Sequence, residues 1–238
     1  MSRSYRVVLF DLFGTVVHFV PPPPDARQQV YEWLRAALAQ HRPAIPFEDF
    51  RSALLEVSAA IAAERAPEHR EVSSPDRFRR VLARFGGADD EGVGEAIARI
   101  HMAHLADQTA MPSAHLTLLN DIAARYRVGL VSNFDHGPTA QAILARHGVH
   151  RCFDVTLISD DFGRRKPHPS IFQEALTRLG ATADEALYVG DSANDDVAGA
   201  QAVGLDVAWL NRTDGEPPEP PPTHILRQLT DLRPLLGI

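Results

Sequence analysis

Four short polar motifs in this sequence carry side chains that could do chemistry together. Their residues are Asp11, Ser132 with Asn133, Lys166, and Gly190 with Asp191 through Asp196. Carboxylates, a hydroxyl and a lysine in one cleft would suit a divalent cation and a phosphoryl group, because carboxylate oxygens bind hard cations and preorganised donors stabilise developing negative charge. Each motif alone is weak, so the prediction depends on the fold bringing all four to one place.

Buried strands are predicted immediately before three of these motifs, where short apolar runs with β-branched residues end. Five strands are predicted, at 7–10, 128–131, 155–158, 186–189 and 207–210. Helices are predicted at about 116–123, 139–147 and 170–179 and over 225–236. A further helix is predicted to begin at Asp195, which would be its N-cap. This alternation predicts a parallel sheet flanked by helices. Because the carboxyl ends of parallel strands meet at one edge of a sheet, we expect the motifs to converge there.

The segment between the first two motifs has a different texture. From Asp25 to about Gln108, apolar residues recur at helical spacing and predict four helices without a strand. Turns are expected at Pro46, Ala66-Pro67 and Gly86-Gly87. The run Pro21 to Pro24 is expected to be a stiff spacer that leads into this helical insert.

Composition and charge narrow the classes of function. The 238 residues, 45% hydrophobic and 23% charged, are enough for a globular chain with a substantial core. A net charge of −7 disfavours broad contact with nucleic acid or an anionic membrane, and no apolar run reaches membrane-spanning length. The one cysteine, Cys152, forbids an intrachain disulfide. We therefore expect a cytoplasmic protein without a nucleic-acid or membrane partner; the sequence does not predict its oligomeric state.

The order and spacing of the four motifs resemble those of the haloacid dehalogenase superfamily of hydrolases. Its D-x-D-G-T motif is similar to Asp11 through Thr15, and its Ser or Thr after a strand to Ser132. Its Lys before Pro is similar to Lys166, and its G-D-x-x-x-x-D motif to Gly190 through Asp196. The resemblance covers nearly the whole chain. It implies a Rossmann-like three-layer α/β domain with a parallel sheet, formed by residues 1–19 and 109–238, and an all-helical cap domain formed by residues 20–108.

The resemblance also implies catalytic roles. Asp11 would be the nucleophile and would form a covalent aspartyl intermediate that water then hydrolyses. Thr15 and Ser132 would hold the transferring group, and Lys166 would neutralise both Asp11 and the developing charge.

A cofactor and substrate contacts are implied in the same way. Mg²⁺ would be bound by Asp11, Asp191 and the backbone carbonyl of Phe13, and Asp196 would orient Lys166 or a metal-bound water. Substrate contacts are expected from residues beside the nucleophile and in the second motif, namely Phe13, Gly14 and Asn133.

Phe13 departs from the pattern of the family's phosphatases. They have a second aspartate at this position, which protonates the leaving oxygen and activates water, whereas a phenyl ring cannot transfer a proton. We interpret the chain as a Mg²⁺-dependent hydrolase of a small-molecule phosphomonoester whose proton donor lies elsewhere. Candidate donors are His18, His41, His101 and His104; the insert contains no lysine that could take this role.

Two alternatives stay open. The family's 2-haloacid dehalogenases resemble this chain in having an aromatic residue at the position of Phe13, and halide leaves without a proton or a metal. Those enzymes have Ser instead of the Gly190-Asp191 type of metal site and Tyr where Phe172 stands, so the resemblance is incomplete. The other alternative is a binding or regulatory protein that has lost turnover.

Overall fold

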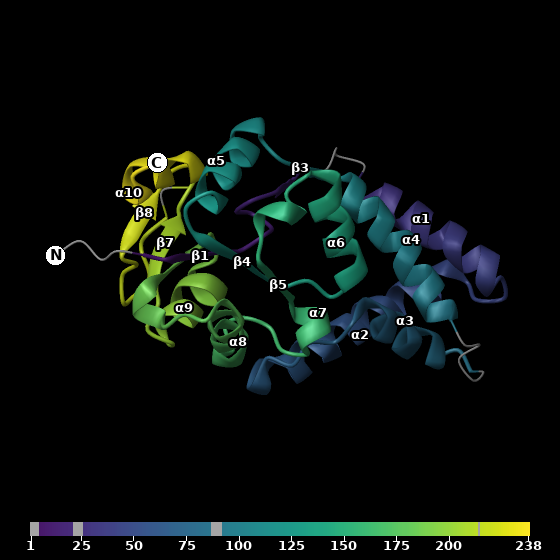
Figure 1. Cartoon of the computed structure of the whole chain (residues 1–238). Helices are drawn as coiled ribbons and strands as arrows, with labels where there is room; N and C mark the ends of the chain where they lie inside the picture. The colour runs from purple at the N-terminus through teal and green to yellow at the C-terminus, as the bar shows by residue number, and fades with distance from the viewer. Residues whose placement is uncertain (1–4, 21–25, 87–91, 214) are drawn as a thin grey trace.

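A six-stranded parallel sheet forms the centre of the larger part of the molecule (Figure 1). The computed structural model describes residues 5–20, 26–86, 92–213 and 215–238. The strand order is β5-β4-β1-β6-β7-β8. These strands are β1 (Val7–Phe10), β4 (Arg127–Ser132), β5 (Val155–Ile158), β6 (Ala186–Gly190), β7 (Asp206–Leu210) and β8 (His224–Leu226). All five strands predicted for the parallel sheet are present.

Strand β1 lies in the middle of the sheet because its four residues are apolar toward both faces. Val8 pairs with Val128 of β4 and with Leu187 of β6. Val8 faces a core shared with α5, α6 and α10, whereas Val7 faces a core shared with α8 and α9. The predicted three-layer α/β fold is therefore confirmed. The helices of this part are α5 (Ser113–Ala123), α6 (Gly137–Arg146), α7 (Ser159–Phe162), α8 (Pro169–Leu179), α9 (Gly199–Gln201) and α10 (Leu232–Leu236).

Four helices form the predicted insert, which lies to the right of the sheet in Figure 1. They share a hydrophobic core of their own, in which the rings of Phe50 and Phe78 stack. Strands β2 (His18–Phe19) and β3 (Thr109–Ala110) pair antiparallel on either side of the insert in the sequence. We propose that this pair marks the boundary between a core domain (1–19 and 109–238) and a cap domain (20–108). The insert helices are α1 (Ala26–His41), α2 (Phe47–Glu68), α3 (Ser74–Ala83) and α4 (Val93–Asp107).

Local expectations differ from the structure at three places. The turn expected at Ala66-Pro67 is absent, because α2 continues to Glu68 and ends at His69, which has φ 49°. Pro67 removes one backbone donor, and α2 ends one residue after it. The closing helix expected over 225–236 is wrong in its first part, because Ile225 pairs with Trp209 in β8 and the helix begins at Leu232. A three-residue strand is too short to show a periodicity of its own.

The third difference concerns Asp195, which is not an N-cap. The capping residue is Ser192, whose Oγ accepts a 3.1 Å hydrogen bond from the Asp195 N–H at the start of a π-helix over Ala193–Ala198. The spacer at Pro21 to Pro24, Asp25 and Gly87 lie outside the described residues. None of the helices in the described ranges has the length and apolar composition that a membrane span requires.

Candidate active site

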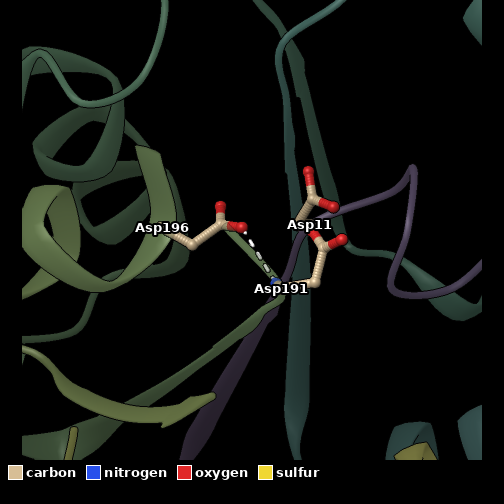
Figure 2. Close-up of side chains that lie close together, drawn as sticks. All are labelled: Asp11, Asp191 and Asp196. Carbon is tan, nitrogen blue, oxygen red and sulfur yellow. Dashed lines mark hydrogen bonds between the residues drawn. The ribbon is translucent and has the colours of Figure 1, made fainter. Parts of the chain in front are cut away.

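The four polar motifs meet at the carboxyl edge of the sheet, as the sequence predicts. Asp11 directly follows β1, Ser132 ends β4, Asp191 directly follows β6, and Lys166 lies in the loop before α8. Oxygen atoms of Asp11, Asp191 and Asp196 lie within 4.8 Å of one another. Figure 2 shows these three carboxylates gathered at the ends of the strands.

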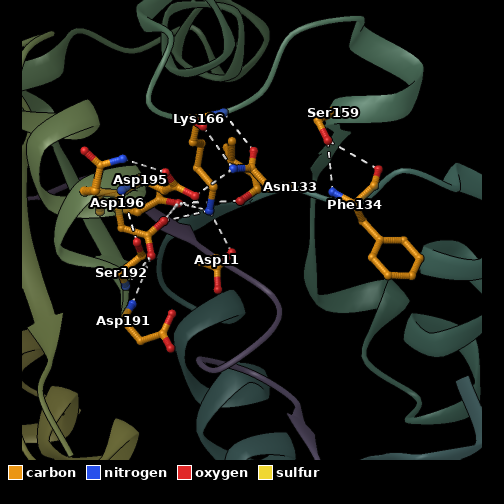
Figure 3. Close-up of polar contacts among 12 residues, drawn as sticks. Asp11, Asn133, Phe134, Ser159, Lys166, Asp191, Ser192, Asp195 and Asp196 are labelled. Atoms are coloured by element: carbon orange, nitrogen blue, oxygen red, sulfur yellow. Dashed lines mark hydrogen bonds and ion pairs between the residues drawn. The ribbon is translucent and has the colours of Figure 1, made fainter. Parts of the chain in front are cut away.

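Lys166 is buried at the centre of this cluster with a relative exposure of 2%. Its Nζ donates hydrogen bonds to Asp11 Oδ1 at 2.7 Å, to Asp196 Oδ1 at 2.6 Å and to the Tyr188 hydroxyl at 2.9 Å (Figure 3). An ammonium group has three donors, so all three are used. Burial alone would lower the pKa of Lys166, but Asp11 and Asp196 more than offset this and raise it. Lys166 therefore carries a positive charge.

Asp196 supports its neighbours with both of its oxygens. Oδ1 accepts hydrogen bonds from Lys166 and from the Tyr188 hydroxyl at 2.8 Å, and Oδ2 accepts the backbone N–H groups of Asp191 at 3.0 Å and Ser192 at 2.9 Å. Four accepted bonds fill the acceptor capacity of a carboxylate. Asp196 is thus less suited to bind a cation than Asp11 or Asp191, in keeping with the supporting role that the sequence predicts for it.

Asp11 and Asp191 are the carboxylates with free oxygens. Asp11 Oδ2 is buried and has no hydrogen-bond partner among the described residues. Burial raises the pKa of Asp11 to about 7, although Lys166 acts in the opposite direction. Burial, followed by the charge of Asp196, raises the pKa of Asp191 to about 6. Two crowded carboxylates with free oxygens are a donor set that fits a hard divalent cation such as Mg²⁺.

Gly14 makes the close approach of Asp191 possible. The residue has φ +89°, and a Cβ on it would lie 2.1 Å from Asp191 Oδ2. Any side chain at this position would therefore displace the Asp191 carboxylate, and the left-handed backbone conformation would itself be strained. Gly14 shapes the carboxylate pair, while its predicted contact with substrate stays a prediction.

Two hydroxyl groups next to Asp11 also lack partners. Thr15 Oγ1 and Ser132 Oγ are buried without a hydrogen bond among the described residues, like Asp11 Oδ2. Leaving a buried polar group unpaired costs about 1–3 kcal/mol, and a bound ligand or ordered water would satisfy these three atoms. This is the arrangement expected if Thr15 and Ser132 bind the transferring group.

Asn133, whose expected contact with substrate stays a prediction, is hydrogen-bonded to the loop that carries Lys166. Its Oδ1 accepts the Lys166 N–H at 2.7 Å, and its Nδ2 donates to the Lys166 carbonyl at 3.0 Å and to Asp195 Oδ2 at 3.1 Å. The side chain is therefore occupied in fixing the loop that carries Lys166, and the expected substrate contact has no support from its hydrogen bonds.

Phe13 belongs to an aromatic cluster beside the nucleophile. Its ring stacks on Phe19 with a centroid distance of 5.0 Å and packs against Phe134 at 4.7 Å. These separations are typical of favourable aromatic pairs. We call Phe13, Phe19 and Phe134 the aromatic wall. The predicted coordination of a metal by the Phe13 carbonyl stays a prediction.

His18, His101 and His104 have other partners, and the role of each candidate histidine as proton donor stays a prediction. His18 Nε2 lies 3.3 Å from an Arg212 nitrogen, and burial, Arg212 and His115 lower the pKa of His18 to about 4. His104 stacks on Trp33. His101 packs against Phe78 inside the insert, and His41 ends α1. Within the described part of the chain, none of the four candidates makes a hydrogen bond to Asp11 or Lys166.

Two residues of the site were missed by sequence reasoning. Tyr188 lies inside the apolar run of β6 and shows no polar signal of its own, although its hydroxyl joins Lys166 and Asp196. Arg212 follows β7 at the same edge of the sheet, and it donates to the carbonyl of Gly14. A charged residue two positions after a predicted strand was the signal that could have identified Arg212.

Comparisons with known proteins agree with this geometry. The model of the haloacid dehalogenase-like hydrolase family matches residues 5–204. Phosphoglycolate phosphatase of Rhodospirillum rubrum is 34% identical over 213 residues, which cover 87% of this chain and 79% of that protein. A crystal structure of 2-haloacid dehalogenase from Pseudomonas syringae pv. tomato has a TM-score of 0.77 and 25% identity, and covers 98% of both chains. The HAD-hydrolase YfnB of Bacillus subtilis, in a crystal structure bound to magnesium, has a TM-score of 0.65 and 22% identity, and covers 99% of this chain and 100% of YfnB.

Proposed function

The chain belongs to the haloacid dehalogenase-like hydrolases, and we propose that it hydrolyses a small-molecule phosphomonoester through an aspartyl intermediate with Mg²⁺. The observation that carries this proposal is the pair of free carboxylates, Asp11 and Asp191, which lie together beside a buried lysine. A halide-releasing site needs only one of these carboxylates. The phosphatase relative and the magnesium bound by YfnB support the same assignment.

The positions of Lys166 and of the unpaired hydroxyls suggest how each group takes part in phosphoryl transfer. Lys166 donates to Asp11 Oδ1, so the unpaired Oδ2 is the atom that attacks phosphorus, and the second lone pair of Oδ1 is the one left for the ion. The P–O bond to the leaving group breaks as the Asp11–phosphoryl bond forms, and water then releases phosphate and regenerates Asp11. The hydroxyl groups of Thr15 and Ser132 donate hydrogen bonds to phosphoryl oxygens, which gives both unpaired hydroxyls a partner.

Asp11 and Asp191, with the backbone carbonyl of Phe13, would hold the Mg²⁺ ion. When bound, the ion supplies positive charge that lets two carboxylates and a phosphate dianion share one site. Asp196 does not need to bind the ion, because its carboxylate accepts hydrogen bonds from Lys166 and from the backbone N–H of Asp191 and so positions both.

A second candidate function, hydrolysis of a carbon–halogen bond, is favoured by Phe13. The aromatic wall includes Phe13, which is two residues after Asp11 in the sequence, and a solved 2-haloacid dehalogenase is similar over 98% of the chain. In this alternative Asp11 attacks carbon and halide leaves, with Asp191 taking no part in binding a metal.

Early-time kinetics separate these functions. Protein at stoichiometric concentration is mixed with p-nitrophenyl phosphate, with and without Mg²⁺, and nitrophenolate release is followed, with Asp11→Asn as the blank. We expect a metal-dependent burst that the Asp11→Asn variant lacks. Absence of both burst and turnover would overturn the proposal. Halide release from a 2-haloacid without metal would then establish the alternative, and cation binding without any turnover would identify a binding protein.

A further inference from the structure

We infer that this site cleaves phosphate esters whose leaving group departs as an anion, with aryl phosphates as the substrate class, and does not cleave simple alkyl phosphates efficiently. The inference rests on the proposed function. It follows from the described side chains that are linked to Asp11, because their protons are committed to other partners.

The buried polar groups of the site are already committed. Each of the three donors on Lys166 has a partner, and the Tyr188 hydroxyl donates to Asp196. The oxygens of Asp196 accept four hydrogen bonds, so this carboxylate has no acidic proton to give. Lys166 is also the only lysine in the sequence, which excludes a second ammonium group as the acid.

The remaining groups of the site are unsuited to acid catalysis. Thr15 and Ser132 are alcohols, which are not among the side chains that serve as general acids. Asp191 is ionised in the proposed function, because it binds the cation. Thus, within the described site, a departing alkoxide finds no proton donor.

His18 of β2 and His115 of α5, which lie near the loop after Asp11, have other partners. His18 Nε2 faces the guanidinium of Arg212 at 3.3 Å, and His115 Nδ1 lies 2.8 Å from the carbonyl of Val16. The two rings pack edge to face at 5.5 Å. Both side chains therefore serve the conformation of this loop.

The aromatic wall supports the preference for an aryl leaving group. Phe19 is 42% exposed although its ring stacks on Phe13, so the wall presents aromatic surface that the protein does not cover. A planar aryl group can pack against such a surface at the ring separations that aromatic pairs prefer. A small hydroxylated alkyl group gains little from the same surface, because its polar groups lose water there.

The reaction balances without a protein acid. Asp11 Oδ2 forms a bond to phosphorus, and the bond from phosphorus to the aryl oxygen breaks with its electron pair on that oxygen, which leaves as a phenolate. Water then attacks phosphorus, its proton passes to the phosphate product or to solvent, and Asp11 leaves as a carboxylate. An alkyl ester would have to release an alkoxide, a far more basic anion, in the first step.

A leaving-group series tests this inference. The second-order rate constant kcat/KM is measured with Mg²⁺ for substituted phenyl phosphates of increasing phenol pKa and for glycerol 2-phosphate. We expect the rate to fall steeply as the phenol pKa rises, and the alkyl ester to react at least about 10²-fold more slowly than p-nitrophenyl phosphate, since a general acid contributes about 10²- to 10⁴-fold. Equal rates for alkyl and nitrophenyl esters would overturn the inference and leave the proposed function intact.

Variants of the aromatic wall sharpen the test. Phe13→Asp places a carboxyl beside the nucleophile and should raise the alkyl rate by about 10²-fold and flatten the dependence on phenol pKa. Phe19→Asp, the matched control, adds a carboxyl to the same wall at its exposed member and should not restore the alkyl rate. If neither the native chain nor Phe13→Asp hydrolyses any phosphate ester, the proposed function falls and the inference with it.

Discussion

Lys166 holds two carboxylates that would otherwise repel each other in a buried site. It contacts Asp11 and Asp196 at 2.7 and 2.6 Å, and its side chain is 2% exposed. Removing one partner of a buried ion pair costs about 3–5 kcal/mol, because the other charges stay buried without compensation. We predict that Lys166→Ala lowers the free energy of unfolding by this amount at pH 8, measured by urea denaturation.

A matched variant separates charge from hydrogen bonding at the same place. Tyr188→Phe removes the hydroxyl that joins Lys166 and Asp196 but leaves all charges, so its cost should be about 1 kcal/mol. An equal loss of stability in the two variants would contradict an electrostatic role for Lys166.

Gly14 allows a second prediction at the scale of single residues. Gly14→Ala should weaken Mg²⁺ binding more than tenfold in isothermal titration, because a Cβ would lie 2.1 Å from Asp191 Oδ2. The control is Gly148→Ala, which has a similar positive φ of +71° but no atom within 4 Å of the new Cβ. Both variants carry the backbone strain of about 1 kcal/mol, so equal Mg²⁺ affinity in both would show that Gly14 does not set the carboxylate geometry.

The site could be predicted to the extent that its residues adjoin strands in the sequence. Asp11, Ser132 and Asp191 stand at the ends of apolar runs, and parallel topology then brings them together. Tyr188 and Asn133 could not be assigned in this way. Tyr188 reaches Lys166 from within a strand, and Asn133 turns its amide to the backbone of a loop 33 residues further along the chain. Both contacts depend on tertiary packing that no local pattern encodes.

At the scale of elements, the connection between α2 and α3 is docked on the loop before Lys166. The Glu71 N–H donates to the Gly163 carbonyl at 3.0 Å, and the Arg165 N–H donates to the His69 carbonyl at 2.9 Å. The buried Glu71 carboxylate accepts bonds from Arg65 at 2.5 Å and from Ser159 Oγ at 2.6 Å. The connection between α2 and α3 thus holds the loop before Lys166 in place.

This contact predicts that a substitution far from Asp11 loosens the loop before Lys166. Glu71→Gln leaves Arg65 without its ion pair and should lower the free energy of unfolding by about 3 kcal/mol. In the folded protein, hydrogen exchange at the amides of residues 71 and 165 should rise together. Glu68→Gln, an exposed site whose ion pair to Arg164 spans 3.7 Å, should change stability by less than about 0.5 kcal/mol. Unchanged exchange in Glu71→Gln would mean that the side chain does not hold this connection in place.

Elements with a long apolar period were predictable, and short ones were not. The five central strands and the four insert helices bury whole faces, so their side chains follow the period of the structure. Strand β8 and the pair formed by β2 and β3 have two or three residues each, and they exist because a neighbouring strand offers hydrogen bonds. Such elements are set by tertiary pairing rather than by local preference.

At the scale of the whole molecule, the carboxylate pair makes the stability of the metal-free protein depend on pH. The pKa of Asp11 is raised to about 7 and that of Asp191 to about 6, both from an ordinary value of 3.8. A carboxyl group whose pKa is raised in the folded state makes its full contribution to stability below a pH of about 4, where it is protonated in both the folded and the unfolded chain. This contribution to the free energy of unfolding is lost as the pH rises through 6 and 7. In EDTA, the free energy of unfolding should therefore be lower at pH 8 than at pH 5. In Asp191→Asn the decrease should be smaller, because one of the two titrations is absent.

Magnesium should reverse this dependence, because the ion binds the two carboxylates only when they are ionised. Its affinity should rise between pH 5 and pH 8. At a concentration 100 times the Kd, it should stabilise the folded chain by about 2.7 kcal/mol. Thermal unfolding at both pH values, with and without Mg²⁺, measures the effect, and Asp191→Asn should show almost none of it. Equal stabilisation of the native chain and Asp191→Asn would place the ion elsewhere on the molecule. Stabilisation at pH 5 as large as at pH 8 would mean that the ion does not depend on ionised Asp11 and Asp191, and that the crowding of these two carboxylates is relieved in another way.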